Sequence, residues 1–352
     1  MDYKKFIDEI ITDMIHESAS DLHLGANRKP IIRINGELIY ITNQKELSNK
    51  DMLGILHVLL EKDKVDNFLK EKEADFSYTY KEGTYLRCNA FFQRGLISLA
   101  FRLIPQIKTL AELNLPPILE IFTKKKQGFF LVVGPIGQGK STTLSTMIDM
   151  INKNEARHIL TIEDPIEFVY KADKSIIDQR EVGPDTKDFP IALKSVFRED
   201  VNVILIGEMR SLETISAAVT AAETGHLVLS TLHTNNASQT IDRIIDSFPP
   251  NQQEQVRLQL ASSLLGIFSQ RLIPRIAGGR VPAYELLINN NAVSNLIREK
   301  RTHEINTVIE TSSGEGMVDL NRSLVDLVSR GEISMESAYQ YSINPKGLER
   351  MI

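Results

Sequence analysis

The apolar positions of the chain follow one pattern in the first hundred residues and another after them. Over residues 5–15 they recur at helical spacing and predict an amphipathic helix. Its apolar residues are Phe6, Ile7, Ile10, Ile11, Met14 and Ile15. Short alternating stretches then predict strands at 21–24, 31–34, 78–80, 86–92 and 98–103, with a hairpin turn at Asn35-Gly36. This half therefore predicts a small α+β domain.

From about residue 118 the apolar residues form continuous runs that alternate with helical patterns. The runs predict strands at 129–133, 158–162, 203–206, 227–231 and 283–288. The patterns between and after them predict helices, for example at 141–151, 212–222 and 252–269. Uninterrupted apolar strands are typical of a parallel sheet that is buried on both faces. The second half therefore predicts an α/β domain.

Breaks in these patterns suggest the domain boundaries. Residues 104–117 contain three prolines and few apolar runs, so we expect a linker there. The last sixty residues are amphipathic and helical in pattern. The expected division is a domain at 1–103, the linker at 104–117, the α/β domain at 118–290 and a helical C-terminal region at 291–352.

Composition narrows the class of protein. The net charge of −5 is spread over intermixed acidic and basic residues, so no basic stripe marks a nucleic-acid surface, and we expect no nucleic-acid partner. Cys88 is the single cysteine, which excludes an internal disulfide and a four-cysteine zinc site. No secretory leader and no run of about eighteen apolar residues is present. We expect a cytoplasmic protein with at most peripheral membrane association.

Residues 134–142 carry the clearest chemical motif. They match G-x-x-x-x-G-K-[ST] between a predicted strand and a predicted helix. Such a loop turns its backbone N–H groups toward phosphates, and the helix N-terminus adds a positive dipole end. We expect ATP to bind here, with Lys140 reaching the β- and γ-phosphates and Ser141 offering its hydroxyl to Mg²⁺. The other expected phosphate-binding residues are Gly134, Pro135, Ile136, Gly137, Gln138, Gly139 and Thr142.

Acidic residues and histidines follow other predicted strands. Glu163 and Asp164 end one strand, and Glu208 ends another, at the edge where ligands meet an open α/β sheet. A carboxylate there orients the attacking water or holds Mg²⁺. His226 and His233 flank a further strand and lie about 23 Å apart along it, too far to share one metal ion. A histidine beside the nucleotide is expected to sense the γ-phosphate.

Further motifs reveal a family resemblance along nearly the whole chain. They are SASDLHL (18–24), TIEDPIEF (161–168), QREVG (179–183), GEMR (207–210), AAETGH (221–226), STLHTNNASQTIDRIID (230–246) and VSNLIRE (293–299). With the phosphate loop, they make the chain resemble the type IV pilus retraction ATPases of the PilT family. The resemblance implies an α/β protein with an N-terminal PAS-like α+β domain, a RecA-like P-loop ATPase domain and a helical C-terminal region. It also implies a homohexameric ring.

The resemblance also assigns roles to residues. It places Glu163 as the general base, Asp164 beside it near the metal, and Glu208 near Mg²⁺ through water. It places His226 and His233 in a histidine box near the nucleotide. Finally, it implies that arginines of the N-terminal domain reach the nucleotide; the best matches are Arg87 and Arg102, with Arg94 as a third candidate.

The implied function is an ATP-driven motor for pilus retraction and twitching motility at the cytoplasmic face of the inner membrane. Its implied partners are a PilC-like platform protein and a second, PilU-like retraction ATPase. One alternative is a PilU-like auxiliary ring subunit with weak hydrolysis, which Ser211 and Ser294 keep open because they depart from the family pattern, as do Ile136 and Gln138. Another is a pilus assembly or type II secretion ATPase, although those usually carry a four-cysteine zinc motif.

Overall fold

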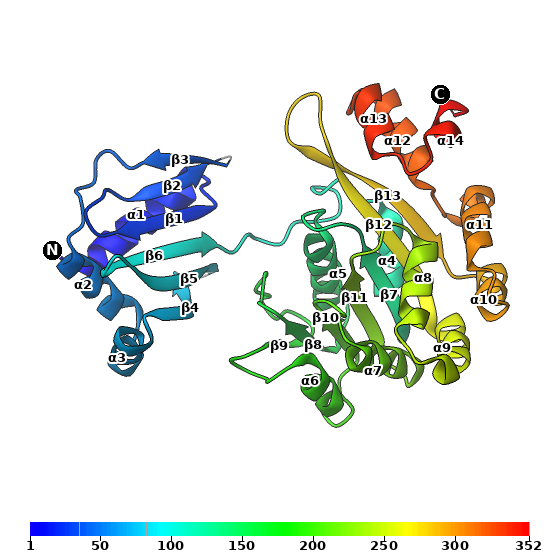
Figure 1. Cartoon of the computed structure of the whole chain (residues 1–352), viewed down its shortest axis with the longest axis horizontal. Helices are drawn as coiled ribbons and strands as arrows, with labels where there is room; N and C mark the ends of the chain where they lie inside the picture. Colours follow the sequence, from blue (N-terminus) through cyan, green and yellow to red (C-terminus); the bar gives the residue numbers. More distant parts are fainter. Residues whose placement is uncertain (35, 82, 352) are drawn as a thin grey trace. The chain divides into compact units, whose positions relative to one another are not determined.

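The computed structural model describes residues 1–34, 36–81 and 83–351, so Asn35 of the expected turn lies outside the described residues. The chain forms two compact units, Met1–Gln106 and Ile107–Ile352 (Figure 1). The expected linker 104–117 spans this boundary, and Leu110 and Leu115 are buried in a core cluster of the second unit. Within the described residues, no helix is long and apolar enough to cross a bilayer.

The first unit is an antiparallel sheet with helices packed on it. Its helices are α1 (Tyr3–His16), α2 (Asn49–Leu59) and α3 (Lys62–Glu71). Its strands are β1 (Asp21–Gly25), β2 (Ile31–Ile34), β3 (Glu37–Tyr40), β4 (Glu73–Tyr80), β5 (Thr84–Gln93) and β6 (Leu96–Leu103). The order of these described strands is β3-β2-β1-β6-β5-β4. Ile34 pairs with Glu37, as the expected hairpin requires. The predicted helix and strands of this half are confirmed.

The predicted apolar stripe of α1 is buried except at its end. Asp2 caps the helix by accepting a hydrogen bond from the backbone N–H of Lys5 at 3.0 Å. Phe6, Ile7 and the next three apolar residues of the stripe are buried, whereas Ile15 is 39% exposed. Ile15 is the next-to-last residue of α1, where the helix turns it away from the sheet.

The second unit is built on a mixed sheet. Its strands are β7 (Gly128–Val133), β8 (His158–Glu163), β9 (Ile176–Glu181), β10 (Val203–Ile206), β11 (Leu227–Leu232), β12 (Leu264–Pro274) and β13 (Arg280–Ile288). In the described part of this unit the strand order is β13-β12-β7-β11-β10-β8-β9. Neighbouring strands run parallel from β12 to β9, and among the described strands of this unit only the β12–β13 pair is antiparallel. The long β12–β13 ribbon is drawn in yellow in Figure 1.

Helices surround this sheet and continue into the C-terminal segment. They are η1 (Pro117–Leu119), α4 (Glu120–Thr123), α5 (Lys140–Asn154), α6 (Phe189–Val196), α7 (Leu212–Glu223), α8 (Ala237–Asp246), α9 (Pro250–Ser263), α10 (Asn291–Arg298), η2 (Thr302–Glu304), α11 (Ile305–Thr311), η3 (Ser313–Glu315), α12 (Leu320–Ser329), α13 (Met335–Tyr341) and α14 (Pro345–Glu349). Leu324 and Leu327 of α12 pack with Ile273 and Val281 of the β12–β13 ribbon. The C-terminal helices therefore share a core with the sheet.

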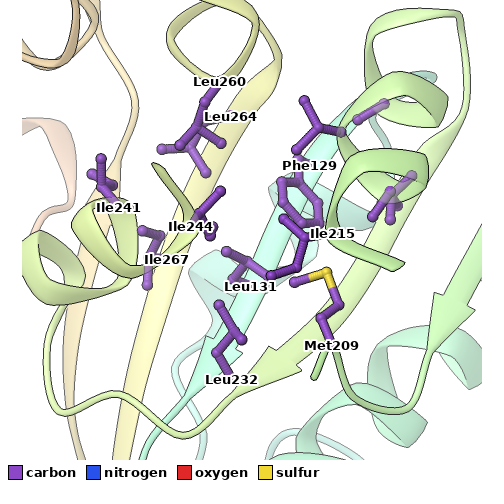
Figure 2. Close-up of a cluster of buried hydrophobic side chains, with 14 of the residues drawn as sticks. Phe129, Leu131, Met209, Ile215, Leu232, Ile241, Ile244, Leu260, Leu264 and Ile267 are labelled. Atoms are coloured by element: carbon purple, nitrogen blue, oxygen red, sulfur yellow. The ribbon is translucent and has the colours of Figure 1, made fainter. Parts of the chain in front are cut away.

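Strand β7 lies at the centre of the core because all six of its residues are buried. Successive side chains of a strand point to opposite faces. Phe129 and Leu131 accordingly pack toward α7, α8 and α9, as Figure 2 shows. Phe130 and Val132 pack on the other face, which α5 covers. A strand buried on both faces explains the uninterrupted apolar run of the sequence.

The structure corrects two sequence predictions in this unit. The helix predicted at 252–269 ends at Ser263, and strand β12 begins at Leu264. The strand predicted at 283–288 exists as part of β13, but it is antiparallel to β12. A fully buried apolar run has no alternation, so periodicity could not separate strand β12 from the end of a buried helix.

Candidate active site

A cavity of about 560 Å³ lies at the carboxyl ends of the parallel strands. Its walls combine the phosphate loop, the residues that follow β8 and β10, and the ends of β11, β12 and β13. They include Ile136, Gly137, Gln138, Gly139, Lys140, Ser141, Thr142, Glu163, Asp164, Glu167, Tyr170, Glu208, Arg210, His233, Leu272 and Arg280. The structure thus brings most of the predicted site residues to one cavity. Gly134 and Pro135, the first two residues of the loop, are not among the residues of its wall.

The phosphate loop has the backbone that its glycines allow. Gly134, Gly137 and Gly139 have φ angles of 144°, 76° and 78°, which side chains with a Cβ rarely adopt. A Cβ at Gly134 would lie 2.4 Å from the carbonyl oxygen of Gln270, so the loop also packs tightly on β12. Among the described residues, no side chain caps the N-terminus of α5 at Gly139. The first N–H groups of α5 therefore suit an anion.

Lys140 is almost completely buried, with 7% of its surface exposed. Its ammonium group donates hydrogen bonds to the carbonyl oxygens of Gly134 at 2.8 Å and Pro135 at 2.9 Å. It also lies 3.2 Å from Nδ1 of His233. Burial lowers the pKa of Lys140, and the nearby Glu208 opposes this effect. The ammonium group is thus held at the base of the loop.

His233 connects Lys140 to the acid that follows β10. Because Nδ1 faces an ammonium donor, the proton of a neutral ring belongs on Nε2. Nε2 lies 3.6 Å from Oε2 of Glu208, and the other oxygen of Glu208 is 2.5 Å from Nη2 of Arg210. Lys140, His233 and Glu208 therefore form one polar chain along the cavity wall.

Glu163 is the last residue of β8 and is 7% exposed. Its Oε1 accepts a hydrogen bond from the Thr161 hydroxyl at 2.7 Å and a longer one from Nε2 of Gln179 at 3.4 Å. Its Oε2 accepts from the backbone N–H of Glu167 at 3.4 Å. Burial raises the pKa of Glu163, although these donors counteract the effect. A carboxyl group poised in this way suits a general base.

Two residues that hold the phosphate loop in place were not predicted from the sequence. Gln270 of β12 donates from Nε2 to the carbonyl oxygen of Gln138 at 2.7 Å, and its Oε1 accepts from the Thr143 hydroxyl at 2.6 Å. The backbone N–H of Leu272 donates to Oε1 of Gln138 at 2.6 Å. The helix predicted at 252–269 hid β12, so no sequence signal placed these residues near the loop.

Two arginines of the cavity wall were also not singled out. Arg210 closes the GEMR motif, which was the available signal for it. Arg280 begins β13 and donates from Nη1 to the carbonyl oxygen of Gly137 at 3.4 Å. Both carry positive charge toward the cavity where phosphates are expected.

The structure corrects the placement of His226 beside the nucleotide. His226 precedes the first residue of β11, whereas His233 follows the last, so the strand separates the two by about 23 Å. Nδ1 of His226 lies 3.1 Å from the carbonyl oxygen of Ala221, and its ring contacts Phe197 edge-on. His226 is therefore a structural residue at the amino edge of the sheet, and it does not line this cavity.

The predicted arginines lie in the first unit. Arg87 on β5 and Arg102 on β6 are directly opposite each other in the sheet, and both are exposed. The guanidinium of Arg102 donates from Nε to Oδ1 of Asp21 at 2.8 Å. Burial opposes the shift, but the hydrogen bonds from Ser20 and Arg102 together lower the pKa of that carboxyl group. Arg94, the third candidate, lies in the β5–β6 turn with a φ of 49°.

The oxygen groups of the cavity fit Mg²⁺. Ser141 in the first turn of α5, Glu208 after β10 and Asp164 after β8 all line the same cavity. Hydroxyl and carboxylate oxygens are the ligands that Mg²⁺ prefers, usually with retained waters and substrate phosphates. These residues are therefore suitable partners for a magnesium-bound nucleotide.

Comparison with known proteins gives concordant matches. A family model described as "Type II/IV secretion system protein" matches residues 2–339. The "Type IV pilus retractation ATPase PilT" of Pseudomonas aeruginosa is 42% identical over 341 residues, which cover 97% of this chain and 99% of that protein. The "Type IV pilus ATPase PilU" of the same species is 38% identical over 350 residues, covering 98% and 91%. The "Crystal Structure of the Pilus Retraction Motor PilT and Bound ADP" matches with a TM-score of 0.90 and 45% identity, covering 98% of this chain and 99% of that one.

Proposed function

Because this chain belongs to the family of type II/IV secretion system proteins, we propose that it is an ATPase motor that drives retraction of a type IV pilus. The observation that carries the proposal is the cavity in which the phosphate loop faces two strand-end acids, Glu163 and Glu208. Phosphoryl transfer needs positioning and charge neutralisation more than covalent help from the protein. The cavity contains groups that can position the nucleotide and groups that can neutralise its charge.

In the proposed reaction, the phosphate loop and Lys140 bind the phosphates. Backbone N–H groups at the start of α5 receive the phosphate oxygens, and the ammonium group of Lys140 leaves its loop carbonyls to contact the β- and γ-phosphates. His233 lies beside Lys140 and so responds to the position of that group. Ser141 and Glu208, with Asp164 nearby, would hold Mg²⁺, which would neutralise phosphate charge.

In the proposed reaction, Glu163 activates the attacking water. Its buried carboxylate accepts a proton from the attacking water, and burial raises its pKa in the direction that suits a base. The contacts of Oε1 with Thr161 and Gln179 keep the group from rotating away from the cavity. The main consequence is that turnover depends on Glu163 whereas ATP binding does not.

We also propose the larger assembly from the family resemblance. Six copies form a ring, the first unit is a PAS-like domain, and Arg87 and Arg102 contribute positive charge to the reaction. The motor works at the cytoplasmic face of the inner membrane on a PilC-like platform protein, with a second ATPase of the PilU kind as a partner. In such a ring, nucleotide turnover is converted into rigid-body motion of subunits.

A second candidate is an auxiliary ring subunit that binds ATP and hydrolyses it weakly, because a PilU protein is among the relatives. The departures at Ser211 and Ser294 lie outside the cavity wall. Ser211 caps α7 by accepting from the backbone N–H of Thr214, and the Ser294 hydroxyl donates to the carbonyl oxygen of Ala261 at 2.9 Å. Both serines fit their local structure, so neither of these two departures favours weak hydrolysis.

The test of this proposal pairs an enzyme assay with a motility assay. A strain that lacks the gene is complemented with the wild-type chain or with Lys140→Ala, and twitching motility and pilus length are recorded. We expect only the wild-type chain to restore retraction, and the purified wild-type protein to hydrolyse ATP. Restoration by Lys140→Ala would contradict an ATP-driven motor. A purified protein that binds ATP without turnover would favour the auxiliary subunit.

A further inference from the structure

The edge strand β9 holds the segment that follows the proposed base. Gln179 and Glu181 are two residues apart on β9, so their side chains point to the same side of the strand. Glu181 accepts from the backbone N–H of Ile166 at 3.0 Å, and Oε1 of Gln179 accepts from the backbone N–H of Tyr170 at 3.0 Å. Nε2 of Gln179 donates to the carbonyl oxygen of Phe168 at 2.8 Å. Alternate residues of the 164–170 segment are therefore bound to β9.

Gln179 also reaches Glu163 itself. It lies directly opposite Thr161 in the parallel pair β8–β9, two residues before the base. From there Nε2 lies 3.4 Å from Oε1 of Glu163, on the oxygen that already accepts the Thr161 hydroxyl at 2.7 Å. One amide side chain thus contacts both the proposed base and the backbone of the wall segment beside it.

The two carboxylate oxygens of Glu163 accept hydrogen bonds from different donors. Oε1 has two side-chain donors, Thr161 at 2.7 Å and Gln179 at 3.4 Å, whereas the donor to Oε2 is the backbone N–H of Glu167 at 3.4 Å. The donors on Oε1 fix the plane of the carboxylate, and Oε2 keeps capacity to accept a hydrogen bond from water. We propose that Gln179 is a positioning residue, which fixes Glu163 and the 164–170 segment relative to each other so that Oε2 meets the attacking water. This inference rests on the proposed role of Glu163 as the base.

The proposal differs from a purely structural role for Gln179. If Gln179 only pinned the edge strand, its loss would loosen the cavity and weaken ATP binding and turnover together. If Gln179 acts through Glu163, its loss would lower kcat and leave ATP affinity nearly unchanged, because the phosphate loop lies on β7 and α5. Misplacement of a reacting group by about 1 Å can cost about 100-fold in rate. A loss of about tenfold or more in kcat is therefore expected.

The experiment measures kcat for ATP and the affinity for a methylanthraniloyl-labelled ATP in the full-length chain. Gln179→Ala removes all three contacts. Gln179→Glu keeps the length of the side chain and the acceptor for Tyr170, but it replaces the donor with a carboxylate oxygen that faces Glu163. Asp178→Ala is the matched control, since it removes a contact to His158 from the neighbouring, oppositely directed side chain of β9. Glu163→Gln and the double variant Glu163→Gln/Gln179→Ala complete the set, measured in single turnover.

We expect Gln179→Ala and Gln179→Glu to lose about tenfold or more in kcat, with affinity within about twofold of wild type and Asp178→Ala unaffected. We also expect the double variant to match Glu163→Gln, because a residue that acts through Glu163 has no further effect without it. A wild-type kcat in Gln179→Glu, a parallel loss of kcat and affinity, or a double variant slower than Glu163→Gln would overturn the inference. If Glu163→Gln itself turns over like wild type, the proposed base is wrong, whatever Gln179 does.

Discussion

The ammonium group of Lys140 has three acceptors in this structure, two loop carbonyls and one histidine nitrogen. It is buried at the base of the loop, and burial lowers its pKa. Such a group gains most when phosphate charge enters the cavity, because a buried cation without an anion is unfavourable. Nucleotide binding therefore depends on this side chain.

We expect Lys140→Ala to lose ATP hydrolysis by at least about 100-fold, since it removes the charge that offsets the transferring phosphate. Steady-state hydrolysis and binding of a labelled ATP measure the effect. Lys153→Ala is the matched control, because Lys153 lies near the end of the same helix and pairs with Asp149 at the surface. Equal activities of the two variants would rule out the phosphate-binding role of Lys140.

Glu285 on β13 is a buried acid whose protonation should make stability depend on pH. Its carboxyl group is buried and accepts a hydrogen bond from the backbone N–H of Ala237 at 2.7 Å. Burial raises its pKa from 4.5 to about 7; Asp319, just before α12, adds to the shift, and Arg271 on β12 opposes it. Between pH 4.5 and 7 the folded chain therefore holds a proton that the unfolded chain has released. Stability should consequently fall as the pH rises through this window.

The free energy of unfolding of wild type should decline by about 3 kcal/mol more than that of Glu285→Gln between pH 4.5 and 7, and level off above that range. The glutamine keeps an acceptor oxygen for Ala237 and cannot titrate, so its own curve lacks this decline. Denaturant unfolding at several pH values provides the measurement. Parallel curves for the two proteins would show that Glu285 does not titrate in this way.

At the scale of elements, strand β12 connects the core to the phosphate loop. It pairs with β7 on one side and β13 on the other, and Gln270 and Leu272 hold Gln138 of the loop. Gly266 allows this close packing, since a Cβ there would lie 2.6 Å from the carbonyl oxygen of Leu287 and 3.0 Å from the ring of Phe122. The strand therefore tolerates no added side chain at this position.

Gly266→Ala should lower the free energy of unfolding by about 1–3 kcal/mol, because a backbone oxygen cannot move aside without breaking the ladder. Gly314→Ala is the matched control, since a Cβ at Gly314 meets no atom within 4 Å. Chemical denaturation of both variants gives the comparison. An unchanged stability in Gly266→Ala would show that β12 and β13 adjust more freely than this packing implies.

The elements also show what sequence patterns could and could not predict. The buried strands β7, β8, β10 and β11 were predicted, because apolar runs bounded by polar turns are typical of such strands. Strand β12 was missed because its apolar run follows a helix directly, and β9 because its exposed edge position leaves it polar. Both misses affected the site, since β12 supplies Gln270 and β9 supplies Gln179. Contacts made across strands depend on sheet order, which the local pattern does not contain.

Site residues within continuous motifs were predicted better than those that depend on tertiary placement. The loop residues 136–142, Glu163, Asp164, Glu208 and His233 line one cavity, because each follows the carboxyl end of a parallel strand. His226 was expected with them on the strength of its motif, yet it lies at the other end of β11. A motif that spans a whole strand begins at the amino end of that strand and finishes at its carboxyl end. The cavity lies at the carboxyl ends of the strands, so only the second half of such a motif reaches it.

At the scale of the whole molecule, the first unit carries the arginines that the family resemblance assigns to hydrolysis. We expect Arg87→Ala and Arg102→Ala each to lower the rate of ATP hydrolysis, by about tenfold or more, through loss of charge near the transferring phosphate. Arg94→Ala tests the third candidate, which lies in the β5–β6 turn. If Arg87→Ala and Arg102→Ala both hydrolyse ATP at the wild-type rate, these arginines have no role in hydrolysis. Their role would then be to stabilise the sheet, as the ion pair of Arg102 with Asp21 does.

We propose that this chain is an ATP-hydrolysing ring motor whose turnover depends on Glu163. The most direct test is steady-state ATP hydrolysis by the purified full-length protein with Mg²⁺, beside Glu163→Gln, with the mass of each assembly recorded. We expect six copies of the 39.7 kDa chain in both proteins, ATP binding in both, and a loss of about 100-fold or more in turnover for Glu163→Gln. Wild-type turnover in Glu163→Gln would show that Glu163 is not the base, and a wild-type hexamer that binds ATP without hydrolysing it would show that the chain is not a motor.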